Sequence, residues 1–183
     1  MRRILVIGSP GAGKSRFSRR LSRSTGIELI HLDRIFWKPG WVESDKREFD
    51  ERLGELLKRD SWIIDGNYSR TLAMRLERAD AVVMLDMNRW ICTWRVLKRG
   101  IFYRKGKRTD MADGCDEHLD ISFLKWTWKY PDRSRPGVIE KLRRNSSEKK
   151  VFWLRSVRDV SSFFEQLGHL KNLEKIEVGS WKQ

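Results

Sequence analysis

The segment Gly8-Ser9-Pro10-Gly11-Ala12-Gly13-Lys14-Ser15 fits the pattern G-x-x-x-x-G-K-[ST] at every fixed position. The apolar run at residues 4–7 precedes it and predicts a buried strand. Residues 15–23 follow it and place Phe17 and Leu21 four positions apart, as on one face of a helix. A phosphate-binding loop, or P-loop, needs this strand-to-helix context. The segment therefore predicts an α/β domain that binds a nucleoside triphosphate.

The chemistry of phosphate binding explains the spacing of this motif. Glycine has no Cβ, so backbone N–H groups can converge on phosphate oxygens, and the positive end of the following helix adds to the attraction. Lys14 is placed to reach the β- and γ-phosphates, and the Ser15 hydroxyl is placed to bind Mg²⁺. The alternative interpretation is a glycine-rich turn that binds no ligand. The expected nucleotide-binding residues are Gly8, Gly11, Ala12, Gly13, Lys14, Ser15 and Arg16.

The composition limits the class of protein. With 183 residues, 39% of them hydrophobic, the chain has the size of one domain and enough apolar side chains for a core, which excludes disorder throughout. The longest purely apolar run, 81–85, is too short to span a membrane. The two cysteines, Cys92 and Cys115, cannot form a disulfide scaffold or a four-ligand zinc site by themselves, so we expect a cytoplasmic protein. The net charge of +14 indicates an anionic partner: nucleotide phosphate, nucleic acid or an acidic surface.

Short apolar runs alternate with amphipathic stretches along the rest of the chain, which is typical of a parallel sheet covered by helices. Further strands are expected at 27–32, 62–64, 81–85 and 151–154. Helices are expected at 47–58, 71–78, 90–99, 123–128, 138–143 and 161–167. Ser44 is the expected N-cap of the first of these, and breaks are expected at Pro131 and Pro136. The tail 168–183 is ambiguous, with 176–178 a candidate strand.

A second informative stretch is Trp62-Ile63-Ile64-Asp65-Gly66-Asn67-Tyr68-Ser69-Arg70-Thr71. Asp65 stands at the end of an apolar strand, where a carboxylate beside a P-loop holds the water molecules of Mg²⁺. Gly66 permits a sharp turn toward a substrate, and Arg70 offers a guanidinium that can clamp a phosphate. The alternative interpretation is an ordinary turn at the end of a strand.

These motifs resemble those of the adenylate-kinase-like P-loop kinases and, more closely, those of the bacterial DNA topology modulation proteins related to the flagellar-regulation protein FlaR. The resemblance runs in order up to about residue 167. Besides the P-loop, it rests on His31-Leu32-Asp33, Phe36-Trp37, Pro39-Gly40-Trp41, Ile64-Asp65-Gly66-Asn67-Tyr68, 80–86, 95–99, Asp110-Met111, Gly114-Cys115 and Glu117. It implies a single P-loop kinase-like domain over residues 1–183, a three-layer α/β sandwich around a five-stranded parallel sheet in the order 2-3-1-4-5. It also implies an acceptor-binding segment at 33–60 and a lid at 100–120.

Arg95 and Arg99 match the Arg-x-x-x-Arg that opens the lid of nucleoside monophosphate kinases. In those kinases the two arginines cover the base and neutralise the transferring phosphoryl group. The i, i+4 spacing puts both guanidinium groups on one helical face, which is unfavourable unless an anion binds there. A solvated basic face is the alternative. Residues 103–120 beyond them show almost no apolar periodicity, so we expect a lid that is mobile without ligand.

Asp33 and Arg34 follow the second expected strand, where adenylate-kinase-like enzymes place acceptor-binding residues. If the acceptor is a hydroxyl group, Asp33 would take its proton; if the acceptor is a phosphate, no base is needed and Arg34 matters more. The sequence leaves this choice open. Trp41 lies in an expected loop beside Pro39 and Gly40, where its indole is a candidate to stack on a base or cover the site.

The residues, taken with the family resemblance, predict Mg²⁺-dependent transfer of the ATP γ-phosphoryl group to a small acceptor, for which a nucleotide is one candidate. The expected catalytic residues are Lys14, Arg95, Arg99 and Asp33, and the expected metal ligands are Ser15 and Asp65. The expected substrate-binding residues are Asp33, Arg34, Trp41, Asp65, Gly66 and Arg70. The alternative is a nucleic-acid-binding regulator that uses ATP as a switch. The charge of +14 and the family's name favour it, although no helix-turn-helix, zinc-finger or RNA-binding signature is present.

Overall fold

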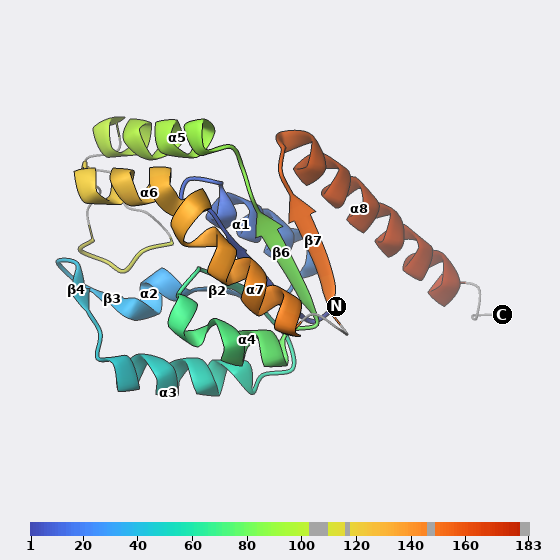
Figure 1. Cartoon of the computed structure of the whole chain (residues 1–183). Coiled ribbons are helices and arrows are strands. Elements are labelled where there is room, and N and C mark those ends of the chain that lie inside the picture. The colour runs from blue at the N-terminus through green and yellow to red at the C-terminus, as the bar shows by residue number, and fades with distance from the viewer. Residues whose placement is uncertain (103–109, 116–117, 146–148, 180–183) are drawn as a thin grey trace.

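A five-stranded parallel sheet forms the centre of the computed structural model (Figure 1). The structure describes side chains as far as residue 169, and the described residues are 1–102, 110–115, 118–145 and 149–179. The strands of the sheet are β1 (Arg3–Gly8), β2 (Leu29–His31), β5 (Trp62–Asp65), β6 (Ala81–Leu85) and β7 (Lys150–Leu154). They are ordered β2-β5-β1-β6-β7, and every neighbouring pair is parallel. This is the order 2-3-1-4-5 that the family resemblance implied, so the expected fold class is confirmed.

Helices cover both faces of the sheet (Figure 1). One face carries α3 (Lys46–Leu57), α4 (Leu72–Arg78) and α7 (Arg135–Asn145), and the other carries α1 (Lys14–Thr25) and α8 (Val157–Gly179). Side chains alternate along β1, so that Leu5 and Ile7 pack on the first face while Ile4 and Val6 pack on the second. Both faces are therefore buried, which produces three layers and explains the continuous apolar runs in the sequence.

The remaining elements follow the carboxyl-terminal ends of the strands. They are α2 (Leu32–Phe36), the hairpin of β3 (Trp37–Lys38) and β4 (Val42–Glu43), the short 3₁₀ helix η1 (Ser69–Thr71), α5 (Arg89–Phe102) and α6 (Ile121–Arg133). Helices α5 and α6 lie side by side (Figure 1). In an open parallel sheet, ligands bind outside the carboxyl ends of the strands, so these elements surround the expected position of a site.

The N-cap of helix α3 lies one residue later in the chain than the sequence indicated, and the helix itself begins at Lys46. Its N-cap is Asp45, whose side chain accepts hydrogen bonds from the backbone N–H groups of Arg47 and Glu48. Ser44 is buried, and its backbone N–H donates to the Phe36 carbonyl oxygen 2.8 Å away. The prediction of Ser44 as the cap was wrong. Serine and aspartate are both good N-caps, and here Ser44 is buried while Asp45 caps the helix.

Helix α6 continues through Pro131, so the break expected at that residue is wrong. Pro131 lies in the last turn, where the missing N–H removes one helical hydrogen bond close to the end of the helix at Arg133. Ser134 separates α6 from α7. Pro136 lies in the first turn of α7, where an N–H group has no partner within the helix in any case.

The candidate strand at 176–178 is also wrong, because α8 continues to Gly179. The sequence contains a signal for this helix that was overlooked: Leu167, Leu170, Leu173 and Ile176 recur every three residues. This spacing is helical and continues past Gly168, so one glycine did not end the helix. Within the described residues, no helix is both long and apolar enough to cross a membrane.

Part of the expected lid is anchored rather than free. Asp110, Met111 and Cys115 are buried, and the Cys115 thiol donates to the Lys38 carbonyl oxygen at 3.3 Å. The backbone also joins the hairpin, because the N–H of Gly40 donates to the carbonyl oxygen of residue 114 at 2.9 Å. The expectation of an unanchored segment is therefore wrong for residues 110–115. Residues 103–109 and 116–117 of the expected lid lie outside the described residues.

Candidate active site

The P-loop, residues 8–15, runs from the end of β1 into α1 and is held by close backbone contacts. A Cβ on Gly8 would lie 2.0 Å from the carbonyl oxygen of Leu85, and one on Gly11 would lie 2.4 Å from that of Cys92. The φ angles of the two glycines are +139° and +73°. A side chain at Gly8 would collide with the backbone of β6, and one at Gly11 with the backbone of α5, so glycine is required at both positions.

Lys14 lies over the P-loop and faces two carboxylates. Its Nζ donates to the carbonyl oxygens of Gly8 and Ser9, at 3.1 and 3.0 Å. Burial lowers the pKa of Lys14, and the charges of Asp65 and Asp33 oppose that shift. The two carboxylates therefore compensate the dehydrated ammonium group only in part, and a phosphate chain would add further negative charge. The structure thus brings three predicted site residues together.

Two oxygen donors suited to Mg²⁺ belong to elements that adjoin the P-loop. Ser15 is the second residue of α1, and Asp65 is the last residue of β5, in register with Val6 of β1. Asp65 is buried, and its Oδ2 lies 3.0 Å from the Nδ1 of His31. Hydroxyl and carboxylate oxygens are ligands that Mg²⁺ prefers, so this donor set fits the expected ion. No group of three or more His, Cys, Asp or Glu side chains suited to a metal occurs in the described part of the chain, so phosphate and water would complete the coordination.

The contact between His31 and Asp65 was missed from the sequence. The two residues end neighbouring parallel strands and are register partners in the sheet. The imidazole therefore orients the carboxylate that is expected to act on the metal. A signal existed, because two polar residues that end adjacent strands meet at the same edge of a parallel sheet.

Asp33 lies in the first turn of α2 and accepts a hydrogen bond from the Tyr68 hydroxyl at 2.7 Å. Tyr68 belongs to the β5 loop, which we define as residues 66–68. Burial, and after it the charge of Asp33, raises the pKa of Tyr68, so the hydroxyl remains a hydrogen-bond donor at neutral pH. The pair presents a carboxylate, oriented by a neutral hydroxyl, whose charge acts on Lys14.

Asn67 joins the β5 loop to the P-loop, a role that no sequence motif indicated. Its side-chain oxygen accepts from the Gly8 N–H at 3.0 Å, and its amide nitrogen donates to the Gly8 carbonyl at 2.8 Å. The β1–β5 ladder ends at Asp65, so this side chain continues the pairing of the two strands past the end of β5. The first residue of the P-loop is therefore held by a side chain from another strand.

Arg75 of α4 is fully buried and contacts the same loop. Its guanidinium donates to the carbonyl oxygens of Gly66 at 2.8 Å and Tyr68 at 2.9 Å, and also to that of Asn67. Burial lowers the pKa of Arg75 to about 9, which leaves it charged at neutral pH. Arg75 was missed because an arginine in a short amphipathic helix is expected on the surface.

Two arginines of α5 approach the P-loop. Arg95 Nη1 lies 3.4 Å from the Ala12 carbonyl oxygen. Burial and, to a smaller extent, the charge of Arg99 lower the pKa of Lys14. The guanidinium carbon of Arg99 lies 5.9 Å from the centre of the Phe123 ring. Arg95 thus contacts the P-loop, and Arg99, one turn further along α5, acts by its charge on Lys14.

Arg70 and Arg16 do not join this cluster. Arg70 forms an ion pair with Asp50 of α3 and also contacts the carbonyl oxygen of Lys46. The Arg70 side chain is 47% exposed, and it points toward α3. Arg16 is exposed on the first turn of α1.

Two further predicted residues lie beside the acceptor segment. Arg34 is exposed and lines a groove of about 630 Å³ between β2 and α3, together with Arg52 and Arg59. Trp41 lies between β3 and β4, with its ring centre 5.4 Å from that of Trp37 and 5.6 Å from that of His118. Trp41 thus packs among other rings of the hairpin region.

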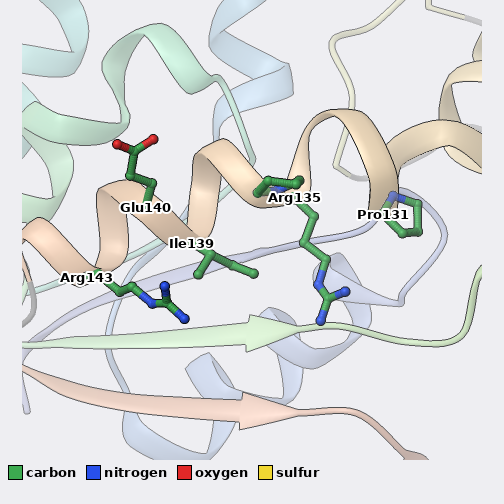
Figure 2. A pocket seen from close by; sticks show the side chains of 6 residues that line it. Pro131, Arg135, Ile139, Glu140 and Arg143 are labelled. Carbon is green, nitrogen blue, oxygen red and sulfur yellow. The ribbon is translucent and has the colours of Figure 1, made fainter.

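Another hollow, of about 300 Å³, runs along α6 and α7 and contains none of the predicted site residues (Figure 2). Arg135 lines it and forms an ion pair with Asp86, the residue after β6, at 2.8 Å. Asp86 also accepts a hydrogen bond from the Trp153 indole at 3.0 Å. Asp86 is thus engaged by Arg135 and Trp153. The carboxylates whose charges act on Lys14 are instead Asp33 and Asp65.

The chain is similar in sequence to proteins named as adenylate kinases. No protein-family model matches the chain, so the resemblance to the FlaR-related proteins remains an expectation from its motifs. A Thermococcus kodakarensis protein named "Putative adenylate kinase" is 25% identical over 156 residues, which cover 77% of this chain and 85% of that protein. A Pyrococcus furiosus protein of the same name is 24% identical over 146 residues, which cover 70% and 77%.

Solved kinase structures superimpose on most of the chain. A shikimate kinase from Acinetobacter baumannii in complex with shikimate gives a TM-score of 0.54 at 17% identity, covering 96% of this chain and 95% of that one. The chain has the P-loop kinase fold. A deoxyadenosine kinase from M. mycoides with bound dATP gives a TM-score of 0.50 at 15% identity, covering 90% and 98%. At these identities the likeness establishes the fold, and the substrate has to be argued from the site.

Proposed function

We propose that this protein is an ATP-dependent kinase that transfers the γ-phosphoryl group to a hydroxyl group of a small acceptor. The observation that carries the proposal is the Asp33 carboxylate, which is oriented by the Tyr68 hydroxyl and coupled by charge to Lys14 of the P-loop. This arrangement puts a proton acceptor next to the place where a P-loop holds the terminal phosphates of ATP.

Each residue of the cluster has a role in this reaction. The P-loop N–H groups and Lys14 bind the phosphates, and Ser15 and Asp65 would hold Mg²⁺, which adds positive charge when bound. The acceptor oxygen forms a bond to the γ-phosphorus while the bond to the β–γ bridging oxygen breaks. ADP leaves with that electron pair, and the proton of the acceptor passes to Asp33. Arg95 and Arg99 neutralise the charge on the phosphoryl group during transfer.

A hydroxyl acceptor fits the charges better than a phosphate acceptor. A phosphate needs a clamp of cations, yet Arg70 pairs with Asp50 and the Arg75 guanidinium is directed at backbone carbonyl groups. The Asp33 carboxylate would repel a phosphate placed next to it, whereas it would accept a hydrogen bond from a hydroxyl group.

We place the acceptor over segment 33–60 and assign the lid to residues 100–120. The described contacts between residues 110–115 and the β3–β4 hairpin support this assignment, because they join the chain beyond Arg99 to the segment that begins with Asp33. The relatives and structures reported above are named as kinases, and we therefore do not propose the nucleic-acid-binding alternative.

A phosphoryl-transfer screen tests the proposal. Protein, ATP and Mg²⁺ are incubated with nucleosides, small alcohols and nucleoside monophosphates, and ADP formation is followed above the rate without acceptor. We expect stimulation by a compound with a free hydroxyl group and no stimulation in Lys14→Ala. Stimulation by nucleoside monophosphates alone would contradict the hydroxyl assignment, and ATP hydrolysis without any effect of acceptors would contradict the kinase assignment.

A further inference from the structure

Arg75 is a fully buried cation with no carboxylate partner among the described residues. Burying a charge is unfavourable unless hydrogen bonds replace the lost water. Four backbone carbonyl oxygens do so here, and three of them come from consecutive residues of the β5 loop, Gly66, Asn67 and Tyr68. The fourth belongs to Thr71, at 3.4 Å. The guanidinium therefore donates most of its hydrogen bonds to the β5 loop.

These contacts decide which way the loop faces. All described peptide bonds are trans, so each carbonyl group directed at Arg75 turns the N–H of the following residue away from it. Tyr68 has a φ of +32°, a value that L residues rarely adopt. A loop with such strain persists only when surrounding contacts hold it, and the guanidinium provides three of them.

The β5 loop in turn contacts both halves of the site. Asn67 holds the N–H and the carbonyl of Gly8, the first residue of the P-loop. Tyr68 donates its hydroxyl hydrogen bond to Asp33. A shift of this loop would therefore displace the start of the P-loop and the candidate base together.

We infer that Arg75 is a positioning residue of the nucleotide site, whose guanidinium holds the β5 loop so that Asn67 can fix the P-loop. The inference rests on the proposed binding of ATP by the P-loop and is independent of the identity of the acceptor. Arg75 acts on the nucleotide through Asn67 and Gly8.

A double-mutant cycle tests the linkage. ATP affinity is measured by calorimetry, without acceptor, for Arg75→Lys, Asn67→Ala and the double variant. Lysine keeps the charge of Arg75 but cannot make its planar set of hydrogen bonds. Leu72→Ala is the matched control, because Leu72 is equally buried on α4 and belongs to the hydrophobic core. Thermal unfolding of all variants reports their loss of stability.

We expect each single variant at Arg75 and Asn67 to weaken ATP binding about tenfold, and the double variant to lose no more than about twofold beyond either, because all three break one linkage. Leu72→Ala should lose thermal stability but keep ATP affinity close to wild type. The inference is overturned if the effects of Arg75→Lys and Asn67→Ala multiply, if Arg75→Lys binds as wild type does, or if Leu72→Ala loses as much affinity.

Amide hydrogen exchange without nucleotide gives a second readout that needs no ligand. Exchange in the P-loop, residues 8–11, should rise in Arg75→Lys and in Asn67→Ala but not in Leu72→Ala. Unchanged exchange in Arg75→Lys would overturn the inference even if ATP binds. If the wild-type protein phosphorylates no hydroxyl acceptor while exchange and affinity respond as expected, the proposed function fails and the role of Arg75 stands.

Discussion

The P-loop and the β5 loop are neighbours at the carboxyl edge of the sheet, yet they are held in different ways. The P-loop is held by the close approach of its own backbone to neighbouring backbone, which only Gly8 and Gly11 allow. The β5 loop is held by side chains, above all by Arg75, which donates hydrogen bonds to its carbonyl groups. The loop in turn contacts the P-loop through the hydrogen bonds of Asn67 to Gly8. A loop built from glycines can be recognised from a short motif, whereas a loop built from distant side chains cannot.

The largest effect is expected inside the P-loop. Lys14→Ala should lower kcat/KM about 10³-fold, because the residue supplies the side-chain cation of this loop to the transferring phosphates. The fold should survive, since burial already disfavours the charge of Lys14. A coupled assay for ADP and a thermal melt check both halves, with the exposed Lys58→Ala as control for one lost charge. Wild-type nucleotide affinity and turnover in folded Lys14→Ala would contradict the P-loop interpretation.

The next effect concerns the base on the acceptor side. Asp33→Asn should lower kcat about 10²- to 10³-fold and leave the KM for ATP near its wild-type value, because the amide cannot take a proton. The matched control is Asp50→Asn, because Asp50 is a carboxylate of α3 that pairs with Arg70 instead. If Asp33→Asn mainly raised the KM of the acceptor and kept kcat, Asp33 would bind the acceptor without acting as a base.

A smaller effect is expected for the arginines of α5. Arg99→Ala should lower kcat about 10- to 100-fold and raise the KM for ATP much less, because a charge clamp acts mainly in the transition state. Arg99→Lys should restore little of the rate, since a point charge cannot make the guanidinium fork. The exposed Lys98→Ala on the same helix is the control. Wild-type kinetics in Arg99→Ala would mean that these arginines form only a solvated basic face.

The smallest effect is expected for Arg70. It forms an exposed ion pair with Asp50 of α3, so Arg70→Ala should keep kcat and the acceptor KM within about twofold of wild type. Steady-state kinetics with the acceptor found in the screen provide the measurement. A large rise in the acceptor KM would show that Arg70 turns toward a phosphate acceptor when one binds.

The elements that carry the local motifs could be predicted from the sequence. The P-loop motif fixes the position of Lys14, and the apolar run at 62–64 indicates the end of β5, where Asp65 lies. The sheet order, in contrast, was implied only by the family resemblance. Arg95 and Arg99 could be assigned to one face because helical spacing needs no knowledge of tertiary contacts. These features depend on residues close together in the sequence.

The supporting contacts could not be predicted in the same way. Asn67 and Gly8 are 59 residues apart, and Tyr68 and Asp33 are 35 apart, so neither pair leaves a local pattern. Arg75 contradicts the expectation that a charged residue of an amphipathic helix is exposed. Arg70 was the candidate phosphate clamp because it follows the turn at Asp65 and Gly66, although its side chain pairs with Asp50 of α3.

Phosphorus NMR of the reaction product tests the central claim most directly. The spectrum distinguishes a phosphate ester, formed on a hydroxyl group, from a phosphoanhydride, formed on another phosphate. In the presence of ATP, Mg²⁺ and the active acceptor, we predict that a phosphomonoester appears together with ADP, and that neither forms with Lys14→Ala. A new phosphoanhydride, or inorganic phosphate as the sole product, would contradict the account.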